Sequence, residues 1–125
     1  MIGILINGIY ISLIAVMSTV TTTDQIGYAN LHEWQGGTLM YAHNYLSGAE
    51  FYKAETITVY YDDGDTQVFD AIYAARVPSV NWTYEIQEHS TPGTITLVTC
   101  SDAGMVYLVQ LIPHVESKNA HRAIQ

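Results

Sequence analysis

Short runs of β-branched and aromatic residues, separated by turns that contain glycine or proline, dominate this sequence of 125 residues. Residues 56–61 and 66–73 are two such runs, and the acidic, glycine-containing stretch 62–65 joins them. This pattern predicts a β-hairpin. Residues 94–99 and 105–112 are too apolar for surface strands, so we expect them to form neighbouring central strands.

Helical periodicity is weak, and the best helix candidate is the short segment 47–53. Ser47 and Glu50 have the spacing of a capping box at its start. Six to eight short strands with almost no helix predict a mainly β fold, either a closed barrel or a sandwich. A barrel removes exposed strand edges, which suits a chain with 49% hydrophobic residues. We expect one domain over residues 1–114, followed by a polar tail at 115–125.

The apolar segment 2–17 has two interpretations, a core strand and a signal or membrane anchor. No Lys or Arg precedes Lys53, so the segment lacks a basic leader region. It is also shorter than the ~20 apolar residues that span a bilayer. Its β-branched content favours a core strand, with a tight turn or bulge at Asn7 and Gly8. On this interpretation no signal or anchor is identifiable within the chain, although one could lie upstream.

The charge of the chain limits its partners. Twelve acidic residues against four basic ones give a formal net charge of −8. Nucleic acid is disfavoured, because neutralising phosphates requires clustered Lys and Arg. An amine-bearing partner suits the charge better. The histidines form no spaced cluster with the single cysteine, so we expect no metal and no cofactor. A hairpin turn is a better interpretation of residues 62–65 than a calcium loop.

The reactive side chains are few, and Cys100 is the only thiol. A buried structural cysteine is the ordinary interpretation of a lone cysteine in a strand-rich domain. A nucleophilic cysteine would require a histidine, another cation or a helix dipole nearby.

Several segments together resemble the sortase family of cysteine transpeptidases. Residues 96–100, Thr-Leu-Val-Thr-Cys, resemble the sortase signature in which a central strand ends at the nucleophile. Residues 38–51 resemble the segment that delivers the catalytic histidine, here His43, which lies 57 positions before Cys100. Residues 64–66, Gly-Asp-Thr, are similar to the Gly-Asp hairpin between the two catalytic strands of the family, and residues 24–28 resemble its lead-in to the histidine strand.

This resemblance implies a sortase-like closed β-barrel in which Cys100 and His43 are catalytic. The implied reaction cleaves a sorting-signal peptide through a thioester and transfers the acyl group to an amine. Thr99 would help to position the substrate, and the backbone near Ser101 would help to stabilise the oxyanion. The resemblance also implies a location at the extracytoplasmic face of the membrane or at the cell surface.

One feature departs from the family pattern. Sortases carry an Arg on the strand after the cysteine loop, and here the matching position falls on Val106 or Tyr107. Gln110, Arg76 or no residue at all could take its place. Losing a preorganised oxyanion donor costs roughly 10²-fold to 10³-fold in rate. The alternative function is therefore a catalytically impaired sortase-fold module that binds peptides or serves a structural role.

Overall fold

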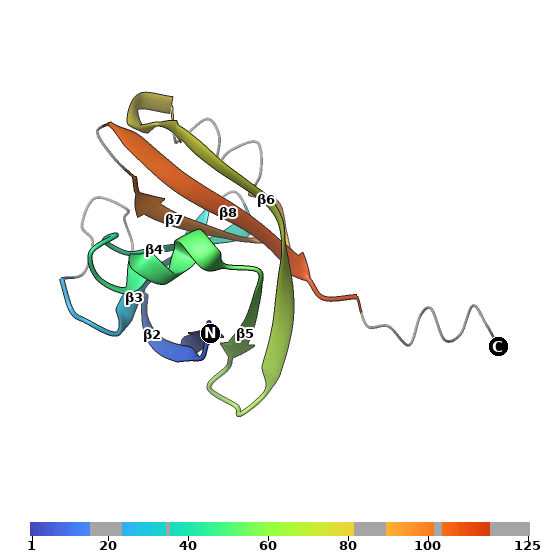
Figure 1. Ribbon diagram of the computed structural model, residues 1–125. Helices are drawn as coiled ribbons and strands as arrows, with labels where there is room; N and C mark the ends of the chain where they lie inside the picture. Colours follow the sequence, from blue (N-terminus) through green and yellow to red (C-terminus); the bar gives the residue numbers. More distant parts are fainter. Residues whose placement is uncertain (16–23, 35, 82–89, 102–103, 116–125) are drawn as a thin grey trace.

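Eight strands close into a single barrel in the computed structural model (Figure 1). The structure describes residues 1–15, 24–34, 36–81, 90–101 and 104–115. Around the barrel the strands follow the order β1-β2-β3-β4-β7-β8-β6-β5, with β5 paired back to β1. The strands are β1 (Gly3–Ile6), β2 (Ile9–Ala15), β3 (Tyr28–Trp34), β4 (Gly37–Tyr41), β5 (Thr56–Tyr60), β6 (Thr66–Pro78), β7 (Ile95–Cys100) and β8 (Met105–Pro113). Two 3₁₀ helices, η1 (Ser47–Lys53) and η2 (Ser79–Asn81), complete the described elements.

The predictions of a mainly β fold and a closed barrel are confirmed. The hairpin expected on either side of residues 62–65 is formed by β5 and β6. Gly64 lies in its turn with a φ of 92°, a conformation that favours glycine. The two apolar runs expected to be neighbours are β7 and β8, which pair antiparallel over the whole length of β7. Of the predicted polar tail, residues 116–125 lie outside the described residues.

The apolar N-terminal segment forms two strands. Asn7 and Gly8, with φ of 52° and 78°, turn the chain between β1 and β2, which pair antiparallel. The predicted tight turn is therefore confirmed, while residues 16–17 lie outside the described part. Within the described residues, no helix has the length and apolar character needed to cross a bilayer.

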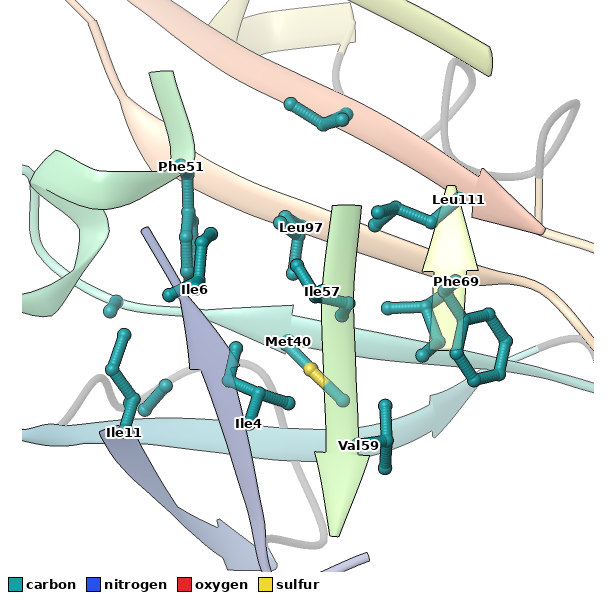
Figure 2. Close-up of a cluster of buried hydrophobic side chains, with 14 residues drawn as sticks. Ile4, Ile6, Ile11, Met40, Phe51, Ile57, Val59, Phe69, Leu97 and Leu111 are labelled. Atoms are coloured by element: carbon teal, nitrogen blue, oxygen red, sulfur yellow. The ribbon is translucent and has the colours of Figure 1, made fainter. Parts of the chain in front are cut away.

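The sheet carries two apolar clusters, one on each face. The larger cluster fills the barrel interior and contains Leu97 and Leu111 (Figure 2). The smaller one lies on the outer face of the same strands: Leu39, Tyr41, Val77, Val98 and Leu108. Because successive side chains of a strand alternate between faces, these clusters show which way each neighbouring residue points.

Helix η1 lies at one end of the barrel, where it contacts β3, β7 and β8 (Figure 1). Its Phe51 is fully buried in the interior cluster and lies near Ile6 in Figure 2. The predicted segment is correct, but the predicted capping box is wrong. Leu46 is the N-cap residue, and no side chain caps the helix. The Ser47 hydroxyl is buried without a hydrogen-bond partner, whereas the Glu50 carboxylate accepts a hydrogen bond from Asn7.

We expect Asp70 to make the stability of the barrel depend on pH. A hydrogen bond from His114 lowers the pKa of Asp70 below its ordinary value of 3.8. Partial burial acts in the opposite direction and raises the pKa, whereas a hydrogen bond from Thr56 lowers it further. A carboxylate with a depressed pKa stabilises the folded state above its unfolded pKa, and this contribution is lost as the pH falls through the folded pKa. We expect Asp70→Asn to lower the melting temperature near pH 6, and the gap to wild type to close as the pH falls below about 3.8.

Circular dichroism melts over this pH range measure the effect of Asp70→Asn. His114→Ala removes the other partner and should give a gap at pH 6 as well. A gap for Asp70→Asn of equal size at every pH would contradict the assignment.

Candidate active site

Cys100 is the last residue of β7, and its side chain is exposed. Five consecutive buried residues precede it in the strand. Val98 belongs to the outer cluster, so by strand alternation the Cys100 side chain also points to the outer face. The thiol is therefore presented at the rim of the barrel, at the end of a rigid buried strand.

The parallel pairing of β4 with β7 brings His43 to the same rim. The β4 residues from Thr38 to Tyr41 each pair with the β7 residue 57 positions later, as Tyr41 does with Val98. A further hydrogen bond of 3.3 Å, from the Ala42 N–H to the Val98 carbonyl, extends the ladder past the end of β4. If this register continued for two more residues, His43 would lie opposite Cys100, on the same outer face of the sheet.

The chain turns sharply after His43. The His43 carbonyl accepts hydrogen bonds from the N–H groups of Leu46 and Gly48, each 3.0 Å long. Gly48 packs so closely that a Cβ there would lie 2.5 Å from the Ala42 carbonyl oxygen and 2.7 Å from that of His43. Glycine is thus required at position 48 to fold η1 back against the histidine segment.

Thr99 joins the two strands that end at this site. Its hydroxyl donates a 2.8 Å hydrogen bond to the carbonyl of Ala42, the residue before His43. The side chain is 3% exposed, and alternation places it on the inner face, opposite to the thiol. Its described contact is therefore with the protein, where it ties the Cys100 strand to the His43 segment.

Two threonines of β7 give a paired test of this contact. Thr99→Val is expected to lower the free energy of unfolding by about 1 kcal/mol, because the Ala42 carbonyl loses its donor. The Thr96 hydroxyl is buried without a partner, so Thr96→Val is expected to be neutral or stabilising by up to about 1 kcal/mol. Urea denaturation of both variants measures the difference. Equal losses would contradict the role given to the Thr99 hydroxyl.

The ring of His43 has two described neighbours. Its Nε2 lies 3.1 Å from Oδ1 of Asp24, a residue in the segment that leads into β3. The phenol of Tyr45 stacks on the ring with centroids 4.9 Å apart and planes 17° apart. Sequence reasoning singled out residues 24–28 but gave Asp24 no role, because the contact joins segments that no local pattern connects.

On the inner face, aromatic side chains support the end of β7. The Tyr52 hydroxyl, from η1, donates a hydrogen bond to the Cys100 carbonyl. Its ring packs against that of Tyr107 on β8, with centroids 4.9 Å apart. The Ser101 N–H donates a 2.9 Å hydrogen bond to the Met105 carbonyl. The family resemblance implies that the backbone near Ser101 stabilises the oxyanion, but this N–H already has a partner within the sheet.

The strand register identifies which residues stand at the place of the missing Arg. Val106 pairs with Cys100, and Tyr107 pairs with Thr99. Gln110 pairs with Thr96, four residues before Cys100, which is about 13 Å along the strand. Gln110 is therefore too far along β8 to reach the thiol.

Arg76 comes nearer to Cys100. It pairs with Tyr107, and its Nε donates a 3.0 Å hydrogen bond to the Ser101 hydroxyl. Val77, the next residue, belongs to the outer cluster, so Arg76 starts from the inner face, opposite to the Cys100 thiol. It therefore contacts Ser101, the residue after Cys100, from the far side of the sheet.

The outer face beside the thiol is apolar. Tyr41, two residues before His43, is buried in the outer cluster, and this burial raises the pKa of its hydroxyl.

Among the described residues, no group of three or more His, Cys, Asp or Glu side chains is arranged to hold a metal ion.

Several solved sortase structures are similar to this one. Sortase A of Listeria monocytogenes superposes with a TM-score of 0.67 at 10% identity, over 90% of this chain and 86% of that chain. Sortase B of Clostridium perfringens gives 0.68 at 12% identity, over 90% and 92%. A lid mutant of sortase A from Corynebacterium diphtheriae gives 0.68 at 14% identity, over 96% and 73%. No protein-family model and no curated protein matches the sequence. The chain has the sortase fold.

Proposed function

We propose that this protein is a cysteine transpeptidase of the sortase type, with Cys100 as the nucleophile and His43 as its proton-transfer partner. The observation that supports this most directly is the β4–β7 register, whose last pair, Tyr41 and Val98, lies two residues before His43 and Cys100 on a sortase-fold barrel. The exposed thiol and the half-buried imidazole are both accessible to a peptide.

The proposed reaction has two halves. In the first, the imidazole of His43 accepts the thiol proton while the Cys100 sulfur attacks a peptide carbonyl carbon. The tetrahedral intermediate collapses by breaking the C–N bond, and the imidazolium gives its proton to the departing amine. In the second half, an acceptor amine attacks the thioester and its proton passes to the imidazole. The C–S bond then breaks, and the imidazolium returns the proton to the Cys100 sulfur, which restores the thiol. A thioester allows an amine to compete with water.

The partners follow from the same proposal. The donor is the sorting-signal peptide of a protein, and the acceptor is an amine, which the net charge of −8 would attract. Thr99 acts indirectly, because its bond to Ala42 holds the two reacting segments together. We further propose that the protein works at the extracytoplasmic face of the membrane or at the cell surface.

A peptide library with an added primary amine tests the proposal. We expect a peptide–amine product with wild type and none with Cys100→Ala. Mass spectrometry should also detect an acyl adduct on Cys100 after an acid quench. A library that yields neither adduct nor product would contradict the proposed activity.

One observation favours a second function, a sortase-fold module that binds peptides without turnover. The residue paired with Cys100 on β8 is Val106, and the nearby Arg76 approaches from the opposite face. With valine in place of the family's Arg beside Cys100, a preorganised oxyanion donor is missing from this β8 position, which would lower the rate by roughly 10²-fold to 10³-fold. Peptide binding that is equal in wild type and Cys100→Ala, with no adduct in either, is the result that this function predicts.

A further inference from the structure

Asp24 contacts His43 from outside the two strands that carry the reacting pair. It lies in the segment just before β3, where the Ser12 N–H donates a 2.9 Å bond to the Gly27 carbonyl and so fixes the segment to β2. The carboxylate oxygen Oδ1 lies 3.1 Å from Nε2 of His43, which is hydrogen-bonding distance. This contact determines which nitrogen of the ring is left for chemistry.

A neutral imidazole carries one proton, on either Nδ1 or Nε2. An ionised carboxylate only accepts hydrogen bonds, so the contact with Asp24 requires the proton to be on Nε2. Nδ1 then keeps its lone pair and is the nitrogen able to accept a proton. The stacked ring of Tyr45 further restricts how the imidazole can rotate.

We propose that Asp24 is a positioning residue for His43, which holds the Nε2–H tautomer and makes Nδ1 the nitrogen that exchanges protons at the active site. This inference rests on the proposed function for its catalytic meaning, but the tautomer itself does not. During the reaction, Nδ1 takes the proton from the thiol and returns it to the leaving amine. Nε2–H stays bonded to Asp24 throughout, and the carboxylate stabilises the imidazolium that forms in between.

The size of the effect follows from exposure. The Asp24 side chain is 85% exposed and that of His43 is 27% exposed, so water and salt screen the pair. We therefore expect Asp24→Ala to lower kcat for acyl transfer by only about five-fold, with little change in KM. Because screening weakens the wild-type contact, the ratio of wild-type to variant rates should shrink at high salt. Asp24→Glu, which keeps the carboxylate, should recover part of the loss.

The sharpest test is ¹⁵N NMR of the neutral His43 ring, assigned by comparison with His43→Gln. We expect a protonated Nε2 and an unprotonated Nδ1 in wild type, and a mixture of tautomers in Asp24→Ala. Asp62→Ala, which removes an exposed carboxylate from the β5–β6 turn, is the matched control and should leave the wild-type spectrum and rate unchanged. A protonated Nδ1 in wild type, or an Asp24→Ala ring identical to wild type, would overturn the inference.

Methylated histidines at position 43 provide the chemical counterpart. Methylation of Nδ1 should abolish acyl transfer, whereas methylation of Nε2 should reduce it only to the level of Asp24→Ala. The opposite order of activities would overturn the assignment of Nδ1. If wild type forms no acyl adduct at all, the proposed function fails, while the NMR result still decides whether Asp24 sets the tautomer.

Discussion

Replacing Gly48 with alanine is expected to cost about 3 kcal/mol of folding free energy and to abolish any activity of the Cys100–His43 pair. The new methyl group would lie 2.3 Å from the Thr99 hydroxyl, in addition to its clashes with the carbonyls of Ala42 and His43. Since two of the three contacts are with backbone, the strain cannot be relieved by rotating one side chain. The turn after His43 must open instead.

Urea denaturation and the alkylation rate of Cys100 together measure the effect. Gly64→Ala is the matched control, because a Cβ there meets nothing within 4 Å, although its φ of 92° still strains the new residue. It should cost only about 1 kcal/mol and leave the thiol unchanged. If Gly48→Ala lost no more stability than Gly64→Ala, the close packing of η1 on the His43 turn would be wrong.

Removing the imidazole is expected to have the largest effect on chemistry. His43→Ala should slow alkylation of Cys100 by iodoacetamide near pH 7 about ten-fold, because the thiolate is the reactive form and the imidazole no longer accepts its proton. Acyl transfer should fall further, by roughly 10²-fold to 10⁴-fold, since the leaving amine also loses its acid. Rates measured against pH in both proteins give the comparison.

The control for this substitution is His114→Ala, which removes another imidazole from the chain beyond the end of β8. It should leave the alkylation rate of Cys100 unchanged. An alkylation rate that is slow and equal in wild type, His43→Ala and His114→Ala would show an inert thiol and favour the binding module.

The sequence predicts strands well where local chemistry determines them. The β5–β6 hairpin has its acidic glycine turn, and the β1–β2 turn has Asn7 and Gly8 in the conformation that this pair favours. The apolar runs of β7 and β8 identify them as buried before any pairing is known. The number of strands is compatible with a barrel or a sandwich, and the need to protect strand edges favours the closed barrel that the structure has.

The contacts that shape the site depend on the register between distant strands. A resemblance of motifs pairs Cys100 with His43, but only the register shows that Thr99 turns inward and that Gln110 lies four residues too far along the sheet. The capping box predicted at Ser47 is wrong because Asn7, far away in sequence, takes the Glu50 carboxylate. The contacts of Arg76 with Ser101 and of Asp24 with His43 likewise join segments that are distant in sequence, so no local spacing of residues predicts them.

The constant offset between β4 and β7 has a consequence for how such a protein can vary. The chain between His43 and Cys100 runs through η1, β5 and β6. The two residues come together because β4 pairs with β7, and not because the connecting segment has a particular length. Connections such as the β5–β6 turn can therefore lengthen, shorten or be cut without moving the pair. An insertion of one residue inside β7 would instead shift the thiol to the other face of the sheet. Changes of length are therefore expected to be tolerated in the loops and not within the paired strands β4 and β7.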